Sequence, residues 1–125
     1  MSVHTTSPKE QVIESLSDKE YRDLYVEEHI SQGLAFQIRA MREDREWTQS
    51  ELASRTKKVQ ETISQLENPD YGRYTLHTLQ RLASAFDVAL SVQFVPFSEL
   101  VDWTTNLTLR RLAPPSFDEE FEEGS

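Results

Sequence analysis

The segment over residues 48–68, TQSELASRTKKVQETISQLEN, constrains the fold more than any other part of this chain. Its first four residues form the pattern of a capping box, in which the threonine and the glutamate each satisfy a backbone N–H group of the other. A second helical pattern ends at Asn68, because the proline that follows disfavours helical geometry in the residue before it. The segment therefore predicts two short helices, 48–55 and 59–68, joined as in a helix-turn-helix.

Helical spacing of apolar residues predicts further helices on both sides of this segment. Asp18 is placed to cap a helix that begins there, and Gly33 is expected to interrupt it before a second helical stretch. Thr75 is placed to cap another helix, which carries leucines and a phenylalanine on one face. Residues 1–16 are polar and without a clear period, so we expect a frayed lead-in there.

After residue 87 the hydrophobic period changes from about 3.6 to 2, which predicts a strand over residues 88–95. An isolated strand leaves backbone N–H and C=O groups unpaired. One solution is a two-fold dimer in which the strand meets its own copy. The other is pairing with residues 105–110 of the same chain. The alternating apolar residues assigned to the dimer contact are Val88, Leu90, Val92 and Phe94.

The charge of the chain is unevenly distributed. Its 125 residues carry a formal net charge of −9, which by itself argues against nucleic-acid binding over the whole surface. Residues 28–95 hold eight bases and nine acids, and residues 55–81 hold five bases and three acids. The acidity is thus concentrated at the two ends, and the middle of the chain can present a non-negative face.

The segment 48–68 resembles the helix-turn-helix of the lambda-repressor-like (XRE) family of DNA-binding regulators. The Thr-Gln, Glu-Leu-Ala, Thr-Ile-Ser and Leu-Glu-Asn elements fall in one register, and the resemblance extends over residues 34–90. It implies a mainly α fold, a lambda-repressor-like helix-turn-helix bundle, here with a C-terminal β-strand paired across a dimer. Double-stranded DNA is the implied partner, and a dimer would read a palindrome with half-sites about 34 Å apart.

The resemblance assigns the exposed side of the second helix to the bases of the major groove. Glutamine can bond bidentately to adenine, and glutamate can accept from cytosine N4. Gln49, in the first turn of its helix, and the loop after Asn68 are expected at the phosphates, with a hydroxyl from Tyr71 or Tyr74. The predicted DNA-binding residues are Gln49, Lys57, Lys58, Gln60, Glu61, Ser64, Gln65, Asn68 and Arg73.

Two further positions are compared with the family pattern. The turn holds Lys57-Lys58 where the family often has glycine and a small apolar residue. A lysine in left-handed geometry costs on the order of 1 kcal/mol, so either the turn has another shape or Val59 replaces the apolar plug. Arg42 and Glu67 match a pattern in which the first helix pairs with the end of the recognition helix, a structural pair that would fix its angle.

The chain is divided into four regions. We expect an N-terminal segment (1–33), the helix-turn-helix domain (34–87), a strand with a short helix that Ser98 would cap (88–112), and an acidic disordered tail (113–125). The absence of cysteine excludes disulfides and thiolate sites and fits a cytoplasmic protein. No apolar run is long enough to cross a membrane, and no secretory signal is visible.

Neither a catalytic constellation nor a cofactor site is visible. The three glycines are far apart, so no phosphate-binding loop is predicted, and His4, His29 and His77 lack a second ligand at metal spacing. We expect no enzyme, cofactor or metal.

Two functions compete. The first is a homodimeric repressor that reads DNA through the helix 59–68. The second is an antitoxin similar to HigA, which would also repress its own operon and would hold a toxin protein through residues 1–30 or 113–125.

Overall fold

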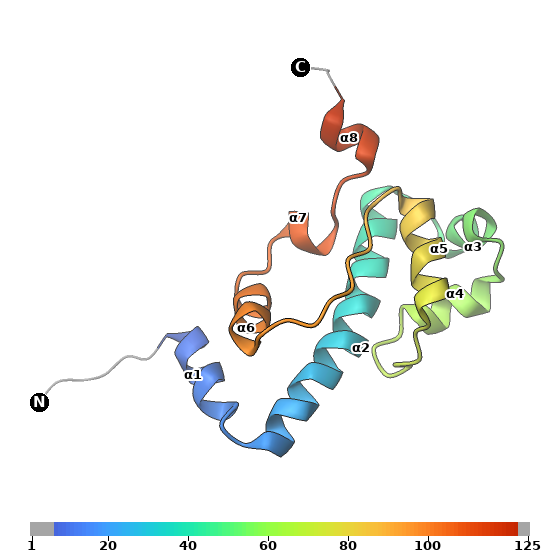
Figure 1. The fold of residues 1–125 in the computed structure, drawn as a ribbon. Helices are drawn as coiled ribbons and strands as arrows, with labels where there is room; N and C mark the ends of the chain where they lie inside the picture. Colours follow the sequence, from blue (N-terminus) through green and yellow to red (C-terminus); the bar gives the residue numbers. More distant parts are fainter. Residues whose placement is uncertain (1–6, 123–125) are drawn as a thin grey trace, which may run out of the picture.

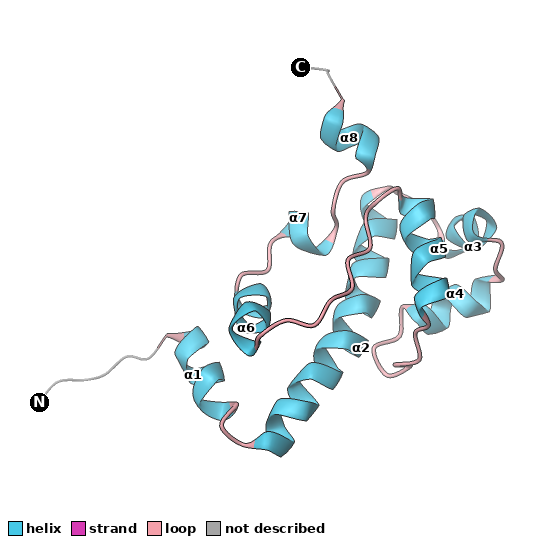
Figure 2. Ribbon diagram, in the orientation of Figure 1, coloured by secondary structure: helices cyan, strands magenta, loops and turns pink. Residues whose placement is uncertain are grey.

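The computed structural model describes residues 7–122, and within them every regular element is a helix (Figure 2). A long helix, α2, runs through the molecule, with the helix-turn-helix elements at its C-terminal end and α1 and α6 at its N-terminal end (Figure 1). None of the described helices is long and apolar enough to cross a membrane. The elements in chain order are α1 (Pro8–Ser15), α2 (Lys19–Asp44), α3 (Gln49–Thr56), α4 (Gln60–Leu66), α5 (Leu76–Phe86), α6 (Phe97–Thr105), α7 (Leu109–Leu112) and α8 (Phe117–Phe121).

The helix α2 begins as predicted, because the Asp18 side chain accepts a hydrogen bond from the backbone N–H of Glu20. The expected interruption at Gly33 is wrong, since α2 continues through it for 26 residues. Glycine in a helix interior costs only about 1 kcal/mol relative to alanine, so one glycine does not end a helix that has packing on both sides. The boundary between the predicted regions 1–33 and 34–87 therefore falls inside one helix.

The core of the helix-turn-helix half lies between α2, α3, α4 and α5. Its large buried side chains come from all four helices, and the Trp47 ring stacks on Phe86 with centroids 5.5 Å apart. Ala113 also belongs to this core, although it lies 27 residues after Phe86. The buried residues of the core are Ile38, Met41, Leu52, Ala53, Ile63, Leu66, Leu82, Phe86 and Ala113.

The prediction of a frayed lead-in over residues 1–16 is partly wrong as well. Ser7 and Glu10 form a capping box that begins α1, and α1 packs against α6. Residues 1–6 of the predicted lead-in lie outside the described residues. The helix was not predicted because residues 8–15 are polar and lack a clear period, although Pro8 stands at the first helical position, where proline is favourable.

Residues 88–96 form neither helix nor strand within the described chain. Pairing with residues 105–110 is wrong, because residue 105 ends α6 and residues 109–112 form α7. Ser98 does not cap the short helix either, since it lies inside α6, whose N-cap is Pro96. The predicted strand thus has no partner among residues 7–122, and its pairing with a second copy stays a prediction.

The expected disorder of residues 113–125 is wrong for the part that the structure describes. Ala113 is buried in the core, and Ser116 is the N-cap of α8, with its hydroxyl accepting from the backbone N–H of Glu119. Asp118, Glu119 and Glu120 lie in the first turn of this helix, where the helix dipole favours negative charge. Residues 123–125 lie outside the described residues.

Candidate nucleic-acid interface

The helix-turn-helix begins with the predicted capping box. The Thr48 hydroxyl accepts from the backbone N–H of Glu51 at 3.0 Å, and the Glu51 carboxylate accepts from the backbone N–H of Thr48 at 3.3 Å. The helix α3 buries Leu52 and Ala53, and the small alanine allows the close packing of α3 with α4. The start of α3 therefore agrees with the sequence pattern.

The turn between α3 and α4 adopts left-handed geometry at Lys57, with φ 57° and ψ 40°. The backbone N–H of Lys58 donates to the carbonyl of Ala53 at 2.8 Å, and that of Lys57 donates to Ser54 at 3.3 Å. These two bonds form a Schellman motif, which satisfies carbonyls that the helix end would leave unpaired. The turn thus keeps a standard helix-ending shape without a glycine, at a conformational cost of about 1 kcal/mol.

The expected role of Val59 as an apolar plug is wrong. Val59 is the N-cap of α4 in an extended conformation, and its side chain is 61% exposed. Helical spacing places residue 59 above Ile63, on the buried side. The extended backbone at the N-cap turns the side chain outward instead, which a helical period cannot reveal.

The helix α4 is shorter than predicted, with Glu67 as its C-cap instead of an end at residue 68. Its two faces differ completely in exposure. Ile63 and Leu66 are buried, whereas the four side chains assigned to base reading are all exposed. The exposed set comprises Gln60, Glu61, Ser64 and Gln65. This face offers amide and hydroxyl groups, which can donate and accept hydrogen bonds, and a carboxylate, which accepts them.

The structure brings Arg42 of α2 and Glu67 together at the end of α4. Arg42 Nε donates to Glu67 Oε2 at 2.6 Å and Nη2 donates to Oε1 at 3.0 Å, while Nη1 donates to the carbonyl of Trp47 at 2.8 Å. The two side chains are 13% and 5% exposed. The hydrogen bond from Arg42 to Glu67 raises the pKa of the guanidinium. This bidentate pair fixes the end of α4 relative to α2.

Gln49 is placed differently from the expectation of a free phosphate contact. Its side-chain amide donates to Glu67 Oε1 at 3.3 Å, and the residue is half-buried. The side chain therefore extends the Arg42–Glu67 pair into a network that joins α2, α3 and α4. Gln49 still occupies the first turn of α3, where the predicted phosphate contact is located.

The loop after α4 is shaped by its own polar side chains. The Asn68 side chain accepts from the backbone N–H of Asp70 at 3.0 Å, and the Tyr74 hydroxyl donates to the carbonyl of Leu66 at 2.6 Å. Burial raises the pKa of Tyr74. Asn68 and Tyr74 therefore hold the loop in place, and Arg73 is the exposed cation on it. The lysines of the turn are exposed at residue 57 and half-buried at residue 58.

A stack of aromatic and cationic groups next to this site was not predicted. The Arg55 guanidinium lies 4.0 Å from the Trp47 ring centroid, and that ring stacks on Phe86. Arg45 lies beside both rings, 6.0 Å from the Trp47 centroid and 5.1 Å from that of Phe86, and it donates to the carbonyls of Phe86 and Pro114. Cation–π contacts of this kind contribute roughly 0.5–2 kcal/mol each. In the sequence, the tryptophan before the capping box was the only indication of this aromatic and cationic stack.

Comparison with known proteins identifies this half of the molecule. Residues 38–93 match the family model described as Helix-turn-helix. No curated protein matches the chain, and no solved structure does. The matched residues contain the end of α2, the helices α3–α5, the turn at Lys57 and the exposed face of α4. Residues 38–93 are therefore a helix-turn-helix domain of the XRE, or lambda-repressor-like, type, and this domain supports the function of a DNA-binding transcription regulator.

Proposed function

We propose that the protein is a sequence-specific repressor that binds a palindromic operator as a homodimer and reads bases through α4. The observation that carries this proposal is the exposed polar face of α4, which the buried Arg42–Glu67 pair holds at a fixed angle to α2. A rigid reading helix is needed because bidentate contacts to base edges tolerate little displacement. Such a regulator acts where the DNA is, so we propose a cytoplasmic location.

The predicted contacts divide into two groups. Gln60, Glu61, Ser64 and Gln65 would read bases, whereas Arg73 and the lysines of the turn would contact phosphates. Gln49 and Asn68 are already bound within the protein and would approach the backbone from these fixed positions. Because few cations lie near this face, we expect weak non-specific affinity and a strong dependence on base contacts and on dimerisation.

Selection of binding sites from random DNA tests the proposal, and the expected product is an enriched palindrome. Gln60→Ala or Gln65→Ala should then weaken binding by about 1–3 kcal/mol at one base position, while Arg73→Ala should weaken all sequences alike and reduce the salt slope. Gln80→Ala is the matched control, since Gln80 is an exposed glutamine on α5. A selection without an enriched palindrome would contradict the proposal.

The homodimer is supported by segment 88–95, whose backbone is unpaired from residue 89 onward within the described chain. Among the described residues, no backbone hydrogen bond joins residues 89–95 to another segment. Val92 and Phe94 are well exposed, and Leu90 is at the border of exposure. Pairing of this segment with a second copy would satisfy the backbone groups and cover these side chains. Sedimentation velocity at tens of micromolar tests this, and a strict monomer would contradict it.

The antitoxin function is the second candidate. It is favoured by the apolar side chains that α1 and the start of α2 leave exposed, namely Ile13, Tyr21 and Leu24. A toxin would cover this surface, or that of residues 113–122. The discriminating observation is a small toxin-like reading frame adjacent to the gene, with co-purification of its product. Without such a neighbour, the antitoxin candidate is excluded.

A further inference from the structure

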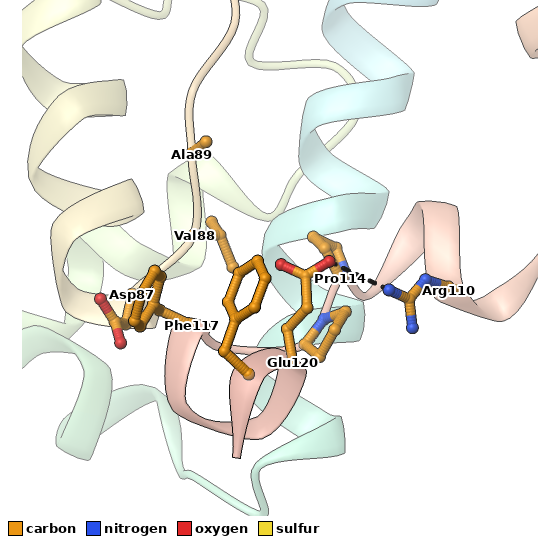
Figure 3. Close-up of a pocket in the computed structure, with 9 residues that line it drawn as sticks. Asp87, Val88, Ala89, Arg110, Pro114, Phe117 and Glu120 are labelled. Atoms are coloured by element: carbon orange, nitrogen blue, oxygen red, sulfur yellow. Dashed lines mark hydrogen bonds and ion pairs between the residues drawn. The ribbon is translucent and has the colours of Figure 1, made fainter. Parts of the chain in front are cut away.

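A groove lies between α8 and the start of segment 88–95. Its volume is about 380 Å³, and its lining is mostly apolar (Figure 3). At one side the groove is closed by an ion pair in which Arg110 Nη2 lies 3.1 Å from Glu120 Oε2. The apolar lining used below comprises Val88, Ala89, Pro114, Phe117 and Phe121.

The wall formed by α8 is held against the helix-turn-helix core. The backbone N–H of Phe117 donates to the carbonyl of Asp87 at 2.8 Å, and Arg45 Nη2 donates to the carbonyl of Pro114 at 3.2 Å. Ala113, just before this wall, is buried in the core. The α8 wall of the groove is therefore fixed to the core. The groove lies at the start of segment 88–95.

Two-fold symmetry limits how this segment can pair with itself. The axis is perpendicular to an antiparallel ladder and keeps each side chain on its own face, so opposite residues must differ by an even number of positions. With Ser91 on the axis, Val88 lies opposite Phe94 and Leu90 lies opposite Val92. With Val92 on the axis, Val88 would lie opposite Pro96, and the four alternating apolar residues would no longer all pair with one another. The first register is therefore favoured.

We infer that the groove receives Phe94 of a second copy of the chain. This inference rests on the homodimer of the proposed function. Phe94 is fully exposed, and it would lie opposite Val88 with Cβ atoms about 4.5–5.5 Å apart. Val88 lines the groove, so the Phe94 ring arrives at its mouth. A cavity of about 150 Å³ holds a benzene ring, and this groove is larger. Symmetry makes two such contacts in each dimer.

The contact explains three features with one arrangement. It covers the most exposed aromatic side chain of the described chain, and it covers the Phe117 and Phe121 rings, which lie 4.9 Å apart and are exposed in the single chain. It also gives the C-terminal residues a function, since α8 forms the far wall of the groove. The C-terminal residues of one copy thus hold residues 88–95 of the other copy in place.

The first test is the dimer dissociation constant of the full chain, measured by sedimentation equilibrium. Phe94→Ser should raise this constant about 100-fold or more, because two phenylalanine side chains lose their burial in each dimer. Phe117→Ser should also raise it. Both residues are exposed in the single chain, so the variants should fold. Phe36→Ser is the matched control on α2 and should leave the constant unchanged.

The second test locates the ring directly. A benzoylphenylalanine at position 94 keeps the aromatic group, and mixing with isotope-labelled chains distinguishes crosslinks between copies. We expect a crosslink to residues 114–121 of the other copy. A crosslink elsewhere, or an unchanged dissociation constant for Phe94→Ser, overturns the groove contact.

A third variant separates this inference from the homodimer itself. The chain has no cysteine, so Ser91→Cys introduces a single thiol, which the two-fold axis brings next to its copy. If Ser91→Cys forms the disulfide dimer while Phe94→Ser has no effect, the dimer holds and the groove contact is wrong. A wild-type chain that stays monomeric overturns both.

Discussion

The two ends of α2 are packed in different ways. At the C-terminal end, α2 buries Ile38 and Met41 in a core shared with three other helices, and Arg42 makes its bidentate pair there. At the N-terminal end, α1 packs against α6, which a hydrogen bond joins to α2, and the buried apolar residues of α6 and of the turn after α1 are Val101 and Leu16. We call these the helix-turn-helix end and the terminal end.

The ion pair of the helix-turn-helix end is also more deeply buried than that of the terminal end. The terminal end is joined by an ion pair between Lys9 and Asp102, with both side chains about half exposed, and by a hydrogen bond between Tyr25 and Thr104. Exposed ion pairs contribute little, whereas a buried bidentate pair organises the groups around it. The difference indicates that one long helix connects a well-packed binding domain to a smaller and less stable layer.

The largest expected difference between the two ends lies in their ion pairs. Glu67→Ala leaves Arg42 buried without its carboxylate and should lower the free energy of unfolding by about 3–5 kcal/mol. Lys9→Ala removes an exposed pair and should cost less than about 1 kcal/mol. Urea unfolding followed by circular dichroism measures both. Equal losses would contradict the distinction between the two ends.

The second test concerns the separate stability of the terminal end. Val101→Ala removes a fully buried side chain from α6 and should cost about 2 kcal/mol. If the terminal end opens by itself, amide exchange will accelerate in α1 and α6 while α3, α4 and α5 keep their protection. Leu52→Ala, in the other core, is the control and should lower the protection of all helices. Uniform acceleration in Val101→Ala would show one cooperative unit.

The same contrast decides how much could be predicted from the sequence. At the helix-turn-helix end the starts of α3 and α5 were predicted correctly, because capping boxes and helical periods are local signals. Thr48 and Thr75 are the N-caps of these helices, and Glu51 completes the capping box of α3, as expected. The pairing of Arg42 with Glu67 came from the family resemblance, since no local pattern joins residues 25 positions apart.

The terminal end and the chain after residue 87 were predicted poorly because their structure depends on distant contacts. The helix α1 is polar and has no buried residue, so it has no strong helical period. Ala113 lies in a core whose other members end at Phe86, and nothing in the acidic sequence around it indicates burial. For segment 88–95, the alternation predicted a strand, but the described chain forms no strand there, and a single chain cannot show what would pair with it.

A smaller effect is expected at the junction of the two ends. Gly33 lies inside α2, and a Cβ added there would meet the His29 ring, at 3.7 Å from Nδ1 and 3.9 Å from Cε1, which are ordinary contacts. Gly33→Ala should therefore raise the free energy of unfolding by about 0.5–1 kcal/mol, and it should slow amide exchange on the N-terminal side of residue 33. A destabilised Gly33→Ala protein would show that α2 needs to bend at this position.

The smallest expected effect is a pH dependence that belongs to the terminal end. His29 was expected to be an ordinary surface residue, but it is half-buried, and burial lowers its pKa below the usual 6.5. The unfolded chain then binds the proton more readily, so stability should fall as the pH decreases from about 6.5 through the lowered pKa. His29→Gln removes this contribution and should make the urea midpoint less dependent on pH between 7.5 and 5.5. Carboxylates such as Glu43, whose pKa is lowered by the hydrogen bond from Arg39, act equally in both proteins, so the difference between the two slopes isolates the imidazole. Identical slopes would place His29 in full contact with water, and the terminal end would then be looser than its packing indicates.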